Sequence, residues 1–537
     1  VVFALRVAPT LRPALYATSI IVNRQFPISP LLLKPSKSID KTSLLWYNET
    51  ITLKKENEMG INKSHIHKFV GDKRFLKVAL SLSIPIALQN LLTSSFSLVD
   101  TLMVGQLGDI QLSAVGMAAQ WNWLLNMIMF GICSGTAVFS SQYWGAGNIK
   151  GIRKTLGISL TFGLLAAFVF AGIGFTAPET VIRIFNRDEA VVREGVAYLS
   201  IAVFSYPAVV ISNILSATLR STERVKIPMY VSGFTAILNA VVNYGLIFGE
   251  FGMPEMGIAG AAVATVISSW ASPVLLILFS VIEKNILCCK PTEFFSFGMP
   301  EIRLFFSKAA PVICNESIWG AGTFVFNIIF ANIGHEYYAA VVILKTFENI
   351  AYAFFIGLCS ACCVMLGKSI GSGEIKEAIR DSRRFAFLVP AIGIIVGALV
   401  ITFRSYLVGL FNLKGNMGDI TMNTAMWISL IYGFEMWIRN IPYIMIVGIF
   451  RSGGDTTMGM VFDTAFQWLI AIPATLVAAF VFKLPFPLVY WIMYISEDIP
   501  KSISCIVYYL TDKWIKPVTD AGKEGIAKYR EEKMLKS

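Results

Sequence analysis

A single carboxylate in an apolar stretch is the residue of this chain best placed to do chemistry. Asp100 is the only charged residue between Val78 and Gly108, a stretch long and apolar enough to span a membrane. A carboxylate at bilayer depth costs about 2.5–3.5 kcal/mol on insertion scales, so it normally faces a bundle interior or a water-filled cavity. There it can be stabilised by a bound cation or by a proton, because desolvation disfavours the charged form. We therefore expect Asp100 to exchange a proton or Na⁺ with the solution. The alternative is a helix-end aspartate that reaches the membrane interface.

Charged residues also lie inside apolar runs of the second half of the chain. Lys345 and Glu348 are spaced i,i+3, and Glu435 and Arg439 are spaced i,i+4. We predict that each pair neutralises itself on one helix face. The alternative is that Glu348 or Glu435 faces a central cavity and attracts a cationic compound. Asp463 is expected to cap or line the start of the eleventh apolar run, and Glu497, Asp498 and Lys501 in the twelfth are expected to pair with one another.

The composition indicates the elements that position these residues. Charged residues make up 15% of the chain and the mean hydropathy is +0.65, whereas soluble domains carry about 25% charged residues. Apolar runs of about 20 residues, separated by short polar segments, predict an all-α, polytopic membrane protein. A β-barrel would show short alternating segments. Most of the eight cysteines lie inside apolar runs, as small core residues rather than a disulfide framework.

Twelve transmembrane helices are predicted, with both termini in the cytoplasm. Lys and Arg are concentrated in the linkers that follow even-numbered spans, whereas the linkers QLGDIQ, GEFGMPEMG and NIGHEYY contain neither. This is the positive-inside pattern of a multi-pass protein of the cell (inner or plasma) membrane, and it explains the net charge of +11 without a nucleic-acid partner. The spans are expected at 76–105, 112–140, 153–177, 190–219, 227–249, 257–282, 304–331, 338–366, 383–403, 420–449, 458–482 and 487–511.

The two halves of the chain resemble each other at a fixed offset of 226 residues, since 311 − 85 and 373 − 147 are both 226. The offset contains six spans, an even number, so both copies enter the membrane from the same side. This predicts two pseudo-symmetric six-helix lobes related by an axis along the membrane normal, with a site between them. The positions that match are Pro85 with Pro311, Gly108 with Gly334, Gly131 with Gly357, Cys133 with Cys359, Gly145 with Gly371, and Gly147 with Gly373.

Five segments follow from these patterns. Residues 1–58 contain no methionine, so we expect a non-native or disordered leader, with translation starting at Met59. Residues 59–75 are expected to be a cytoplasmic lead-in, 76–290 the N-lobe with spans one to six, and 291–512 the C-lobe with spans seven to twelve. Residues 513–537 alternate Lys, Glu and Arg and are predicted to be a solvated or disordered cytoplasmic tail.

Several stretches resemble the MATE (multidrug and toxic compound extrusion) family, in the family's order and spacing. They are SLVDTLMVGQLG, ATLRSTERVKIP, ILNAVVNYGLIFG, MGIAGAAVATVIS and GIFRSGGDTT, and the resemblance covers about residues 75 to 515. It implies a cation-coupled (Na⁺ or H⁺) antiporter that exports amphipathic, often cationic drugs or toxic metabolites by rocker-switch alternating access. Its expected partners are small-molecule substrates and membrane lipid, with no cofactor and no bound metal, and the protein is expected to be a monomer.

The resemblance also assigns candidate residues of the ion site. Asp100 falls on the first-helix acid of the family's N-lobe cation site, Asn239 and Asn243 fall on its polar pair in span five, and Thr265 adds a hydroxyl oxygen. The alternative for the two asparagines is helix–helix hydrogen bonding.

A second site in the C-lobe is less well matched. The possible substrate or cation contacts there are Glu316, one turn before the family's span-seven acid, Asn440, where the family has a span-ten aspartate, Glu348 and Glu435. These departures resemble the single-acid, DinF-like branch of the MOP flippase superfamily.

Two other functions compete with ion-coupled efflux. A lipid-linked oligosaccharide flippase would show a cationic central cavity that holds pyrophosphate. A membrane-embedded enzyme would need a cluster such as His/Asp at one membrane face, and none of the three histidines, His65, His67 and His335, lies in a predicted span. We therefore expect a transporter rather than an enzyme.

Overall fold

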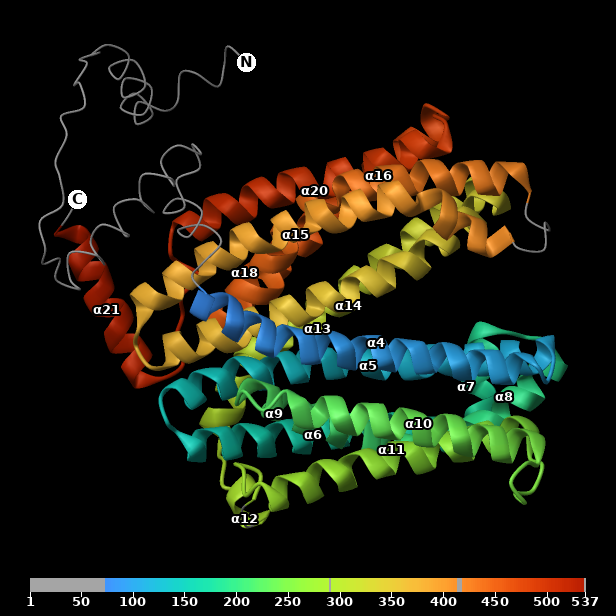
Figure 1. The fold of residues 1–537 in the computed structure, drawn as a ribbon, viewed down its shortest axis with the longest axis horizontal. Coiled ribbons are helices and arrows are strands. Elements are labelled where there is room, and N and C mark those ends of the chain that lie inside the picture. Colours follow the sequence, from blue (N-terminus) through green and yellow to red (C-terminus); the bar gives the residue numbers. More distant parts are fainter. Residues whose placement is uncertain (1–72, 289–290, 413–417, 536–537) are drawn as a thin grey trace, which may run out of the picture. The chain divides into compact units, whose positions relative to one another are not determined.

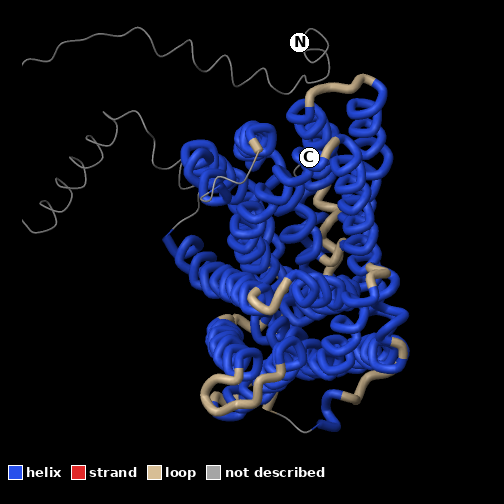
Figure 2. The backbone as a smooth tube through the Cα atoms, turned by 90° about the vertical axis from the view of Figure 1, so that its right-hand side faces the viewer, coloured by secondary structure: helices blue, strands red, loops and turns tan. Residues whose placement is uncertain are grey.

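The computed structural model describes residues 73–288, 291–412 and 418–535, and these residues form helices joined by short connections, without a β-strand (Figures 1 and 2). Long helices are the expected solution in lipid, because each helix satisfies its own backbone hydrogen bonds. The predicted all-α fold is confirmed. The predicted leader, residues 1–58, and residues 59–72 of the lead-in lie outside the described residues.

The first lobe (N-lobe) contains six long rods. A short helix links the third and fourth rods at the end of the bundle opposite the Lys- and Arg-containing connections 145–151 and 221–226. One 3₁₀ turn interrupts the fourth rod (Figure 1). Its elements are α4 (Lys73–Gly105), α5 (Asp109–Gly145), α6 (Ile149–Thr176), α7 (Pro178–Phe185), α8 (Glu189–Ala202), η3 (Val203–Ser205), α9 (Tyr206–Ser221), α10 (Lys226–Phe248) and α11 (Gly257–Ile282).

The second lobe (C-lobe) repeats this plan, with π-helical turns in its last rods. Its elements are α12 (Pro291–Phe294), α13 (Met299–Ile333), α14 (His335–Gly371), α15 (Ile375–Gly409), η4 (Leu410–Asn412), α16 (Asp419–Tyr443), η5 (Ile444–Phe450), α17 (Arg451–Gly453), α18 (Thr456–Phe466), η6 (Gln467–Ala471), α19 (Ile472–Leu476), η7 (Val477–Val481) and α20 (Phe486–Leu510). A last helix, α21 (Asp520–Met534), follows the bundle.

The twelve rods coincide with the twelve predicted spans, although several extend beyond their apolar cores. By length and apolarity, 10 helices among the described residues can cross a membrane. The rods that do not meet this criterion contain α16 and α20, which carry the buried charged residues of spans ten and twelve. The largest boundary error is at the predicted span 383–403, which is Ile375–Gly409. This helix starts earlier because its polar first turns are stabilised by a 3.0 Å ion pair between Arg384 and Asp381.

The two lobes contact each other through pseudo-equivalent helices: α4 packs against α14, and α13 packs against α5. The contacts repeat at the offset seen in the sequence. A Cβ on Gly131 would lie 2.2 Å from the Ile313 side chain, and a Cβ on Gly357 would lie 3.0 Å from Ala87 Cβ. Ile313 and Ala87 are themselves 226 positions apart. The contacts between the lobes are therefore pseudo-symmetric.

A close, pseudo-symmetric approach of the lobes lies at one end of the bundle, where α5 and α14 terminate. We call this end, with its connections 145–151, 221–226, 371–376 and 451–455, the basic end; it is on the left in Figure 1. A Cβ on Gly145 would lie 1.9 Å from the Lys368 carbonyl oxygen, and a Cβ on Gly371 would lie 1.9 Å from the Gln142 carbonyl oxygen. Only glycine allows this crossing of two backbones.

The segment after α20 was predicted to be a solvated tail, and this prediction is wrong for residues 514–519. Trp514 is fully buried and packs against Gly453. The Lys516 amide donates to the Gly453 carbonyl at 2.7 Å, and the Val518 amide donates to Gln142 Oε1 of the N-lobe at 2.8 Å. The segment therefore joins the two lobes at the basic end, and only α21 beyond it is a largely exposed helix.

Candidate functional site

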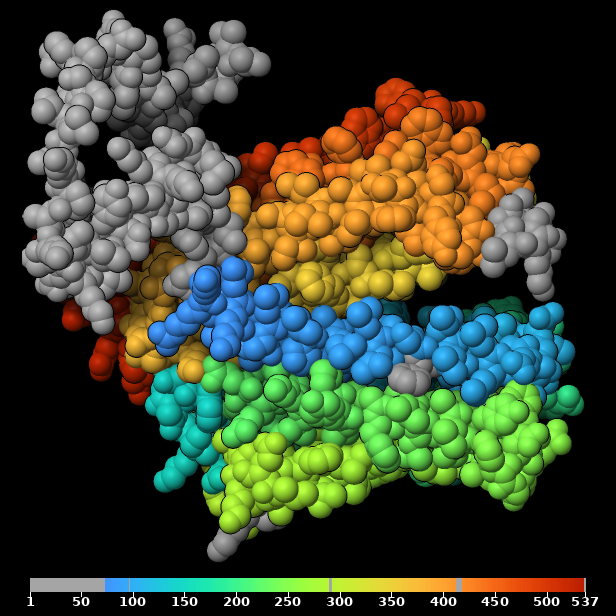
Figure 3. All heavy atoms as spheres, in the orientation of Figure 1, coloured from blue at the N-terminus to red at the C-terminus, as the bar shows by residue number. Residues whose placement is uncertain are grey.

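α4 packs along α10 (Figure 3), and Asp100 belongs to the part of α4 that lies away from the basic end. It precedes the last residue of the helix, Gly105, by five positions, about 8 Å along the axis. Asn243 of α10, which is 0% exposed, donates a hydrogen bond through Nδ2 to Asp100 Oδ1. Of the two span-five asparagines, Asn243 therefore contacts the first-helix acid directly.

The hydrogen bonds continue from Asn243 into α11. Asn243 Nδ2 also donates to Asn239 Oδ1 at 3.2 Å, and Asn239 Nδ2 donates to Ser268 Oγ at 3.1 Å. Three helices thus contribute to one polar chain inside an apolar bundle. Polar atoms in such surroundings are costly unless they are paired, so the chain defines where α4, α10 and α11 meet.

One atom in this series of hydrogen-bonded side chains has no hydrogen-bond partner among the described residues. Asn243 Oδ1 is buried and accepts no hydrogen bond from the described residues. It belongs to the amide whose nitrogen bonds Asp100, so a carboxylate and an unpaired amide oxygen are held next to each other. Oxygens of these two kinds are the ligands that hard cations prefer.

Tyr198 of α8 also lies near the acid. Thr265 Oγ1, the predicted hydroxyl ligand, donates to the Ala261 carbonyl of its own helix at 3.0 Å and forms no hydrogen bond with Asp100 among the described residues. Tyr198 is close enough to Asp100 for their charges to interact. Sequence reasoning missed Tyr198 because a tyrosine within an apolar span carries no signal of its own.

The C-lobe buries more charged side chains than the N-lobe does. The buried ion pair that involves α14 and α16 joins these two different helices. Glu348 Oε1 of α14 pairs with Arg439 Nη2 of α16 at 3.1 Å, and Lys345 Nζ donates to Asn327 Oδ1 of α13 at 2.8 Å. The predicted pairs Lys345–Glu348 and Glu435–Arg439 therefore form no direct ion pair, although their charges still interact within each helix. The guanidinium of Arg439 also lies 4.8 Å from the centre of the Tyr494 ring, and such desolvated contacts are stronger than an exposed pair on one helix face.

Glu435 and Asn440 bond different neighbours. Glu435 Oε1 accepts from the Trp491 indole at 3.0 Å, while its buried Oε2 has no hydrogen-bond partner in the described part of the chain. Asn440 Nδ2 donates to the Met436 carbonyl of its own helix at 2.7 Å, so this amide is already engaged.

Lys501 is the centre of a second group of ion pairs. Its Nζ lies 2.8 Å from Asp463 Oδ1 and 2.6 Å from Glu497 Oε1, and Asn315 Nδ2 donates to Asp463 Oδ2 at 3.1 Å. The predicted pairing of Glu497 with Lys501 is confirmed, whereas Asp463 does not cap its helix but joins α18 to α13 and α20. The ammonium group of Lys501 thus lies between the carboxylates of Asp463 and Glu497.

Glu316 of α13 is paired with Arg451 of α17, and their Oε1 and Nη2 atoms are 2.8 Å apart. We expect Arg451→Met to destabilise the protein strongly, because it leaves a buried carboxylate without its partner, a change that costs about 3–5 kcal/mol. The double variant Arg451→Met/Glu316→Leu should recover most of this loss. Thermal unfolding in detergent measures both variants. An additive double variant, less stable than either single variant, would contradict the assignment of this pair as a structural one.

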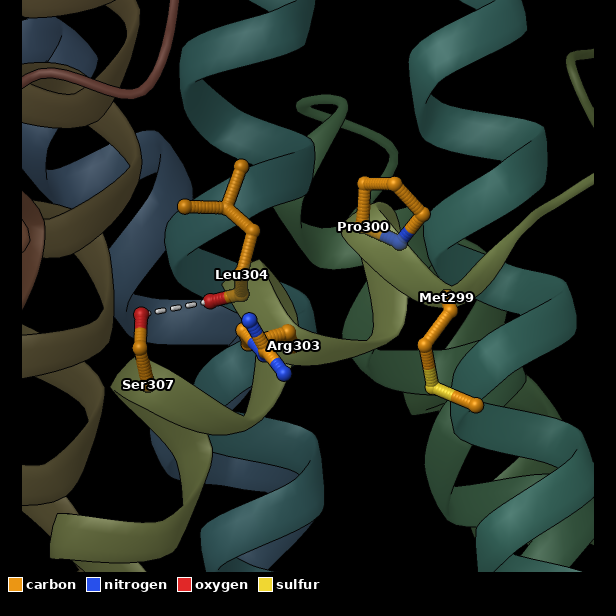
Figure 4. Close-up of a pocket in the computed structure, with 5 residues that line it drawn as sticks. All are labelled: Met299, Pro300, Arg303, Leu304 and Ser307. Atoms are coloured by element: carbon orange, nitrogen blue, oxygen red, sulfur yellow. Dashed lines mark hydrogen bonds between the residues drawn. The ribbon is translucent and has the colours of Figure 1, made fainter.

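A hollow at the surface of α13 lies apart from these acids. Met299, Pro300, Arg303, Leu304 and Ser307 line it, and Ser307 Oγ donates to the Leu304 carbonyl at 2.7 Å (Figure 4). Ser307 is nine residues before Glu316, about 14 Å along the helix. This hollow belongs to the basic end and not to the ion site.

Among the described residues, no group of three or more His, Cys, Asp or Glu side chains is arranged to hold a metal ion. Two lobes of membrane-length helices, with a largely buried carboxylate inside the first lobe, are the architecture of a membrane transporter. The family model described as MatE matches residues 85–245 and 311–477, and the chain belongs to this family. The two matched segments start 226 residues apart, as the internal repeat predicts.

Relatives and solved structures agree with this assignment. The chain is 26% identical, over 82% of its length and 93% of the relative's, to a "Probable multidrug resistance protein NorM" of Thermotoga maritima. It is 24% identical, over 73% of its length and 85% of the relative's, to the "Multidrug resistance protein NorM" of Vibrio cholerae. Its fold matches the Vibrio cholerae MATE transporter VcmN in the bent form with a TM-score of 0.74 at 16% identity, covering 84% of this chain and 98% of that one. The twelve-helix, two-lobed fold is thereby confirmed.

Proposed function

We propose that this protein is an antiporter that exports amphipathic, often cationic compounds, driven by Na⁺ or H⁺ bound at Asp100. The observation that carries the proposal is the hydrogen bond from Asn243 to Asp100 beside a buried, unpaired amide oxygen. A carboxylate in that position is stabilised when it binds a cation or a proton. The names of the NorM relatives support drugs as substrates.

The ion would act by changing the relative stability of two arrangements of the lobes. A ligand shifts such an equilibrium only by its differential affinity for the two states. Neutralising Asp100 removes a buried charge from the interface of α4 with α10, and this changes how α4 packs. Because α4 also packs against α14 of the C-lobe, the change is transmitted to the contact between the lobes.

Rocker-switch alternating access is supported by the basic end, which is the cytoplasmic end according to the positive-inside pattern. There the two lobes are joined by Glu223 of the N-lobe, which accepts from Lys368 of the C-lobe at 2.8 Å and from Trp144 at 3.2 Å. Gln142 adds a bond from its Nε2 to the Ser452 carbonyl at 2.9 Å. The structure corresponds in this proposal to the state closed toward the cytoplasm, and these polar contacts must break for substrate to enter.

The competing function, a flippase for a pyrophosphate-linked lipid, needs unpaired cations between the lobes. In the described part of the C-lobe, Arg439, Arg451 and Lys501 are each held by a carboxylate, whereas Lys345 bonds the neutral Asn327 amide. The three carboxylate-bound cations favour transport of cations and uncharged amphipathic compounds over transport of a polyanion.

Proteoliposomes containing the purified full-length protein test the proposal. Movement of a fluorescent lipophilic cation such as ethidium should require an opposing gradient of Na⁺ or of protons, and it should stop when an ionophore collapses that gradient. Protein-free liposomes are the control. Dye movement that ignores both gradients, or that requires ATP, would exclude the proposed antiport.

A further inference from the structure

The hydrogen bonds between Ser268, Asn239, Asn243 and Asp100 have a fixed donor-to-acceptor order, and the Ser268 hydroxyl determines this order. The Ser268 hydroxyl lies 2.9 Å from the Ala264 carbonyl and 3.1 Å from the Thr265 carbonyl of its own helix. A serine hydroxyl has one hydrogen, and two carbonyl oxygens can only accept, so that hydrogen points at the α11 backbone. The Ser268 oxygen therefore presents a lone pair to Asn239.

This lone pair determines the orientation of both asparagine amides. Asn239 must turn its Nδ2 toward Ser268, at 3.1 Å, and so its Oδ1 faces Asn243. Asn243 must then turn its Nδ2 toward Asn239 Oδ1, and the same nitrogen reaches Asp100. The Oδ1 of Asn243 is left buried and unpaired as a consequence.

The direction of the chain distinguishes a metal cation from a proton. In the observed orientation Asp100 receives a hydrogen bond, which stabilises the ionised carboxylate. A protonated Asp100 would need an acceptor, but the Asn243 atom that faces it is a donor. Na⁺ needs oxygen ligands, and the carboxylate and the unpaired Asn243 Oδ1 both supply them.

We propose that Ser268 is a positioning residue that makes the Asp100 site prefer Na⁺ over H⁺. This inference rests on the proposed function of Asp100 as the coupling group. Without the Ser268 hydroxyl, Asn239 loses its fixed partner and its amide can rotate. Asn243 can then rotate as well and offer Oδ1 to a protonated Asp100, so that the site accepts a proton more readily and holds Na⁺ less tightly.

The neighbouring helices offer few other groups that could determine this preference. α11 contains no charged residue, and Tyr198 of α8 is the titratable group whose charge interacts with Asp100. On α10, Lys226 and Tyr230 lie in the first turns, at the basic end, and Tyr244 packs against Phe248. α5 begins with the exposed Asp109, and on α14 His335 pairs with Glu336, Lys345 bonds Asn327 and Glu348 pairs with Arg439.

Ser268→Ala tests the inference in the full-length protein. Two quantities are measured: equilibrium binding of ²²Na⁺ to detergent-purified protein across a pH series, and ethidium efflux from proteoliposomes driven by Na⁺ alone or by a pH gradient alone. Loss of one buried hydrogen bond corresponds to about a five- to tenfold change in an equilibrium constant. We expect the wild type to be driven more effectively by Na⁺, and the ratio of Na⁺-driven to pH-driven efflux to fall about five- to tenfold in Ser268→Ala. Weaker ²²Na⁺ binding should accompany this fall.

Two variants separate positioning from packing. Ser268→Thr keeps the hydroxyl and should restore the wild-type ratio. Ser280→Ala removes another buried serine of α11, twelve residues further along the helix, whose hydroxyl has no partner among the described residues, and it should leave the ratio unchanged.

The outcomes also distinguish this inference from the proposed function. An unchanged ratio and unchanged ²²Na⁺ binding in Ser268→Ala, in a protein whose efflux still depends on Asp100, would overturn the role of Ser268 alone. A wild type driven only by a pH gradient would overturn it too. Efflux that does not depend on Asp100 would instead overturn the proposed function.

Discussion

Asp100→Asn is expected to reduce gradient-driven efflux to the level of protein-free liposomes while the protein still folds and inserts. The asparagine has nearly the same shape and can still form a hydrogen bond with Asn243, so the packing of α4 against α10 is retained. It cannot change its charge, however, and therefore cannot couple the lobes to an ion gradient. Efflux assays, with membrane content and size-exclusion profiles measured in parallel, check this expectation.

Asp109→Asn is the matched control for this variant. Asp109 is an exposed acid in the first turn of α5, at the same end of the bundle as Asp100. Its substitution should leave efflux within about twofold of wild type, because an exposed charge contributes little. Wild-type efflux by Asp100→Asn at equal expression would refute the assignment of Asp100 as the coupling group.

Gly371→Leu is expected to have the second large effect, a loss of turnover to near background. A Cβ at this position would lie 1.9 Å from the Gln142 carbonyl oxygen, a backbone atom that cannot move aside alone. The lobes would therefore be unable to close at the basic end, and the transporter would remain in its other state. Because Gly145 is the pseudo-equivalent residue, with the same 1.9 Å approach to Lys368, Gly145→Leu should act in the same way.

Efflux and dye binding measured separately would identify this defect. A variant held in one state should bind dye but not release it across the membrane, whereas Ser372→Leu, at the adjacent exposed position, should transport normally. Normal turnover by both glycine variants would show that the crossing of α5 and α14 does not take part in the cycle.

The N-lobe site could be predicted from the sequence because its residues follow local rules. Asp100 is conspicuous as the one charged residue between Val78 and Gly108, and Asn239 and Asn243 share a helix face through their i,i+4 spacing. The resemblance to a known family then related the two helices to each other. Ser268 and Tyr198 could not be found in this way, because their roles depend on the rotation of α11 and α8 against α10, which no local pattern encodes.

The C-lobe shows where local rules fail. Lys345 and Glu348 have the spacing of an intrahelical pair, but Glu348 bonds Arg439 of another helix. Within a bundle, a partner on a neighbouring helix that is also screened from water interacts more strongly than an exposed neighbour on the same helix. Tertiary packing therefore overrides the sequence spacing wherever several buried charges compete.

The composition of residues 513–537 also gave a misleading prediction. Averaged over the segment, Lys, Glu and Arg predict a solvated tail, and α21 agrees with this. The first residues differ, because Trp514 and Val518 pack into the cores of different lobes. The composition averaged over residues 513–537 does not reveal a short buried segment that precedes a charged helix.

The most direct test of the account measures conformation rather than transport. Spin labels at the exposed positions Lys150 and Ser372, one on each lobe at the basic end, report the distance between the lobes in a background in which Cys288, Cys289 and Cys314 are replaced by serine. Adding Na⁺, or lowering the pH, should shift the distance distribution of the wild type between two populations. In Asp100→Asn the distribution should respond to neither. If Asp100→Asn responds to the ions as the wild type does, the charge state of this carboxylate does not control the lobes, and the account is wrong.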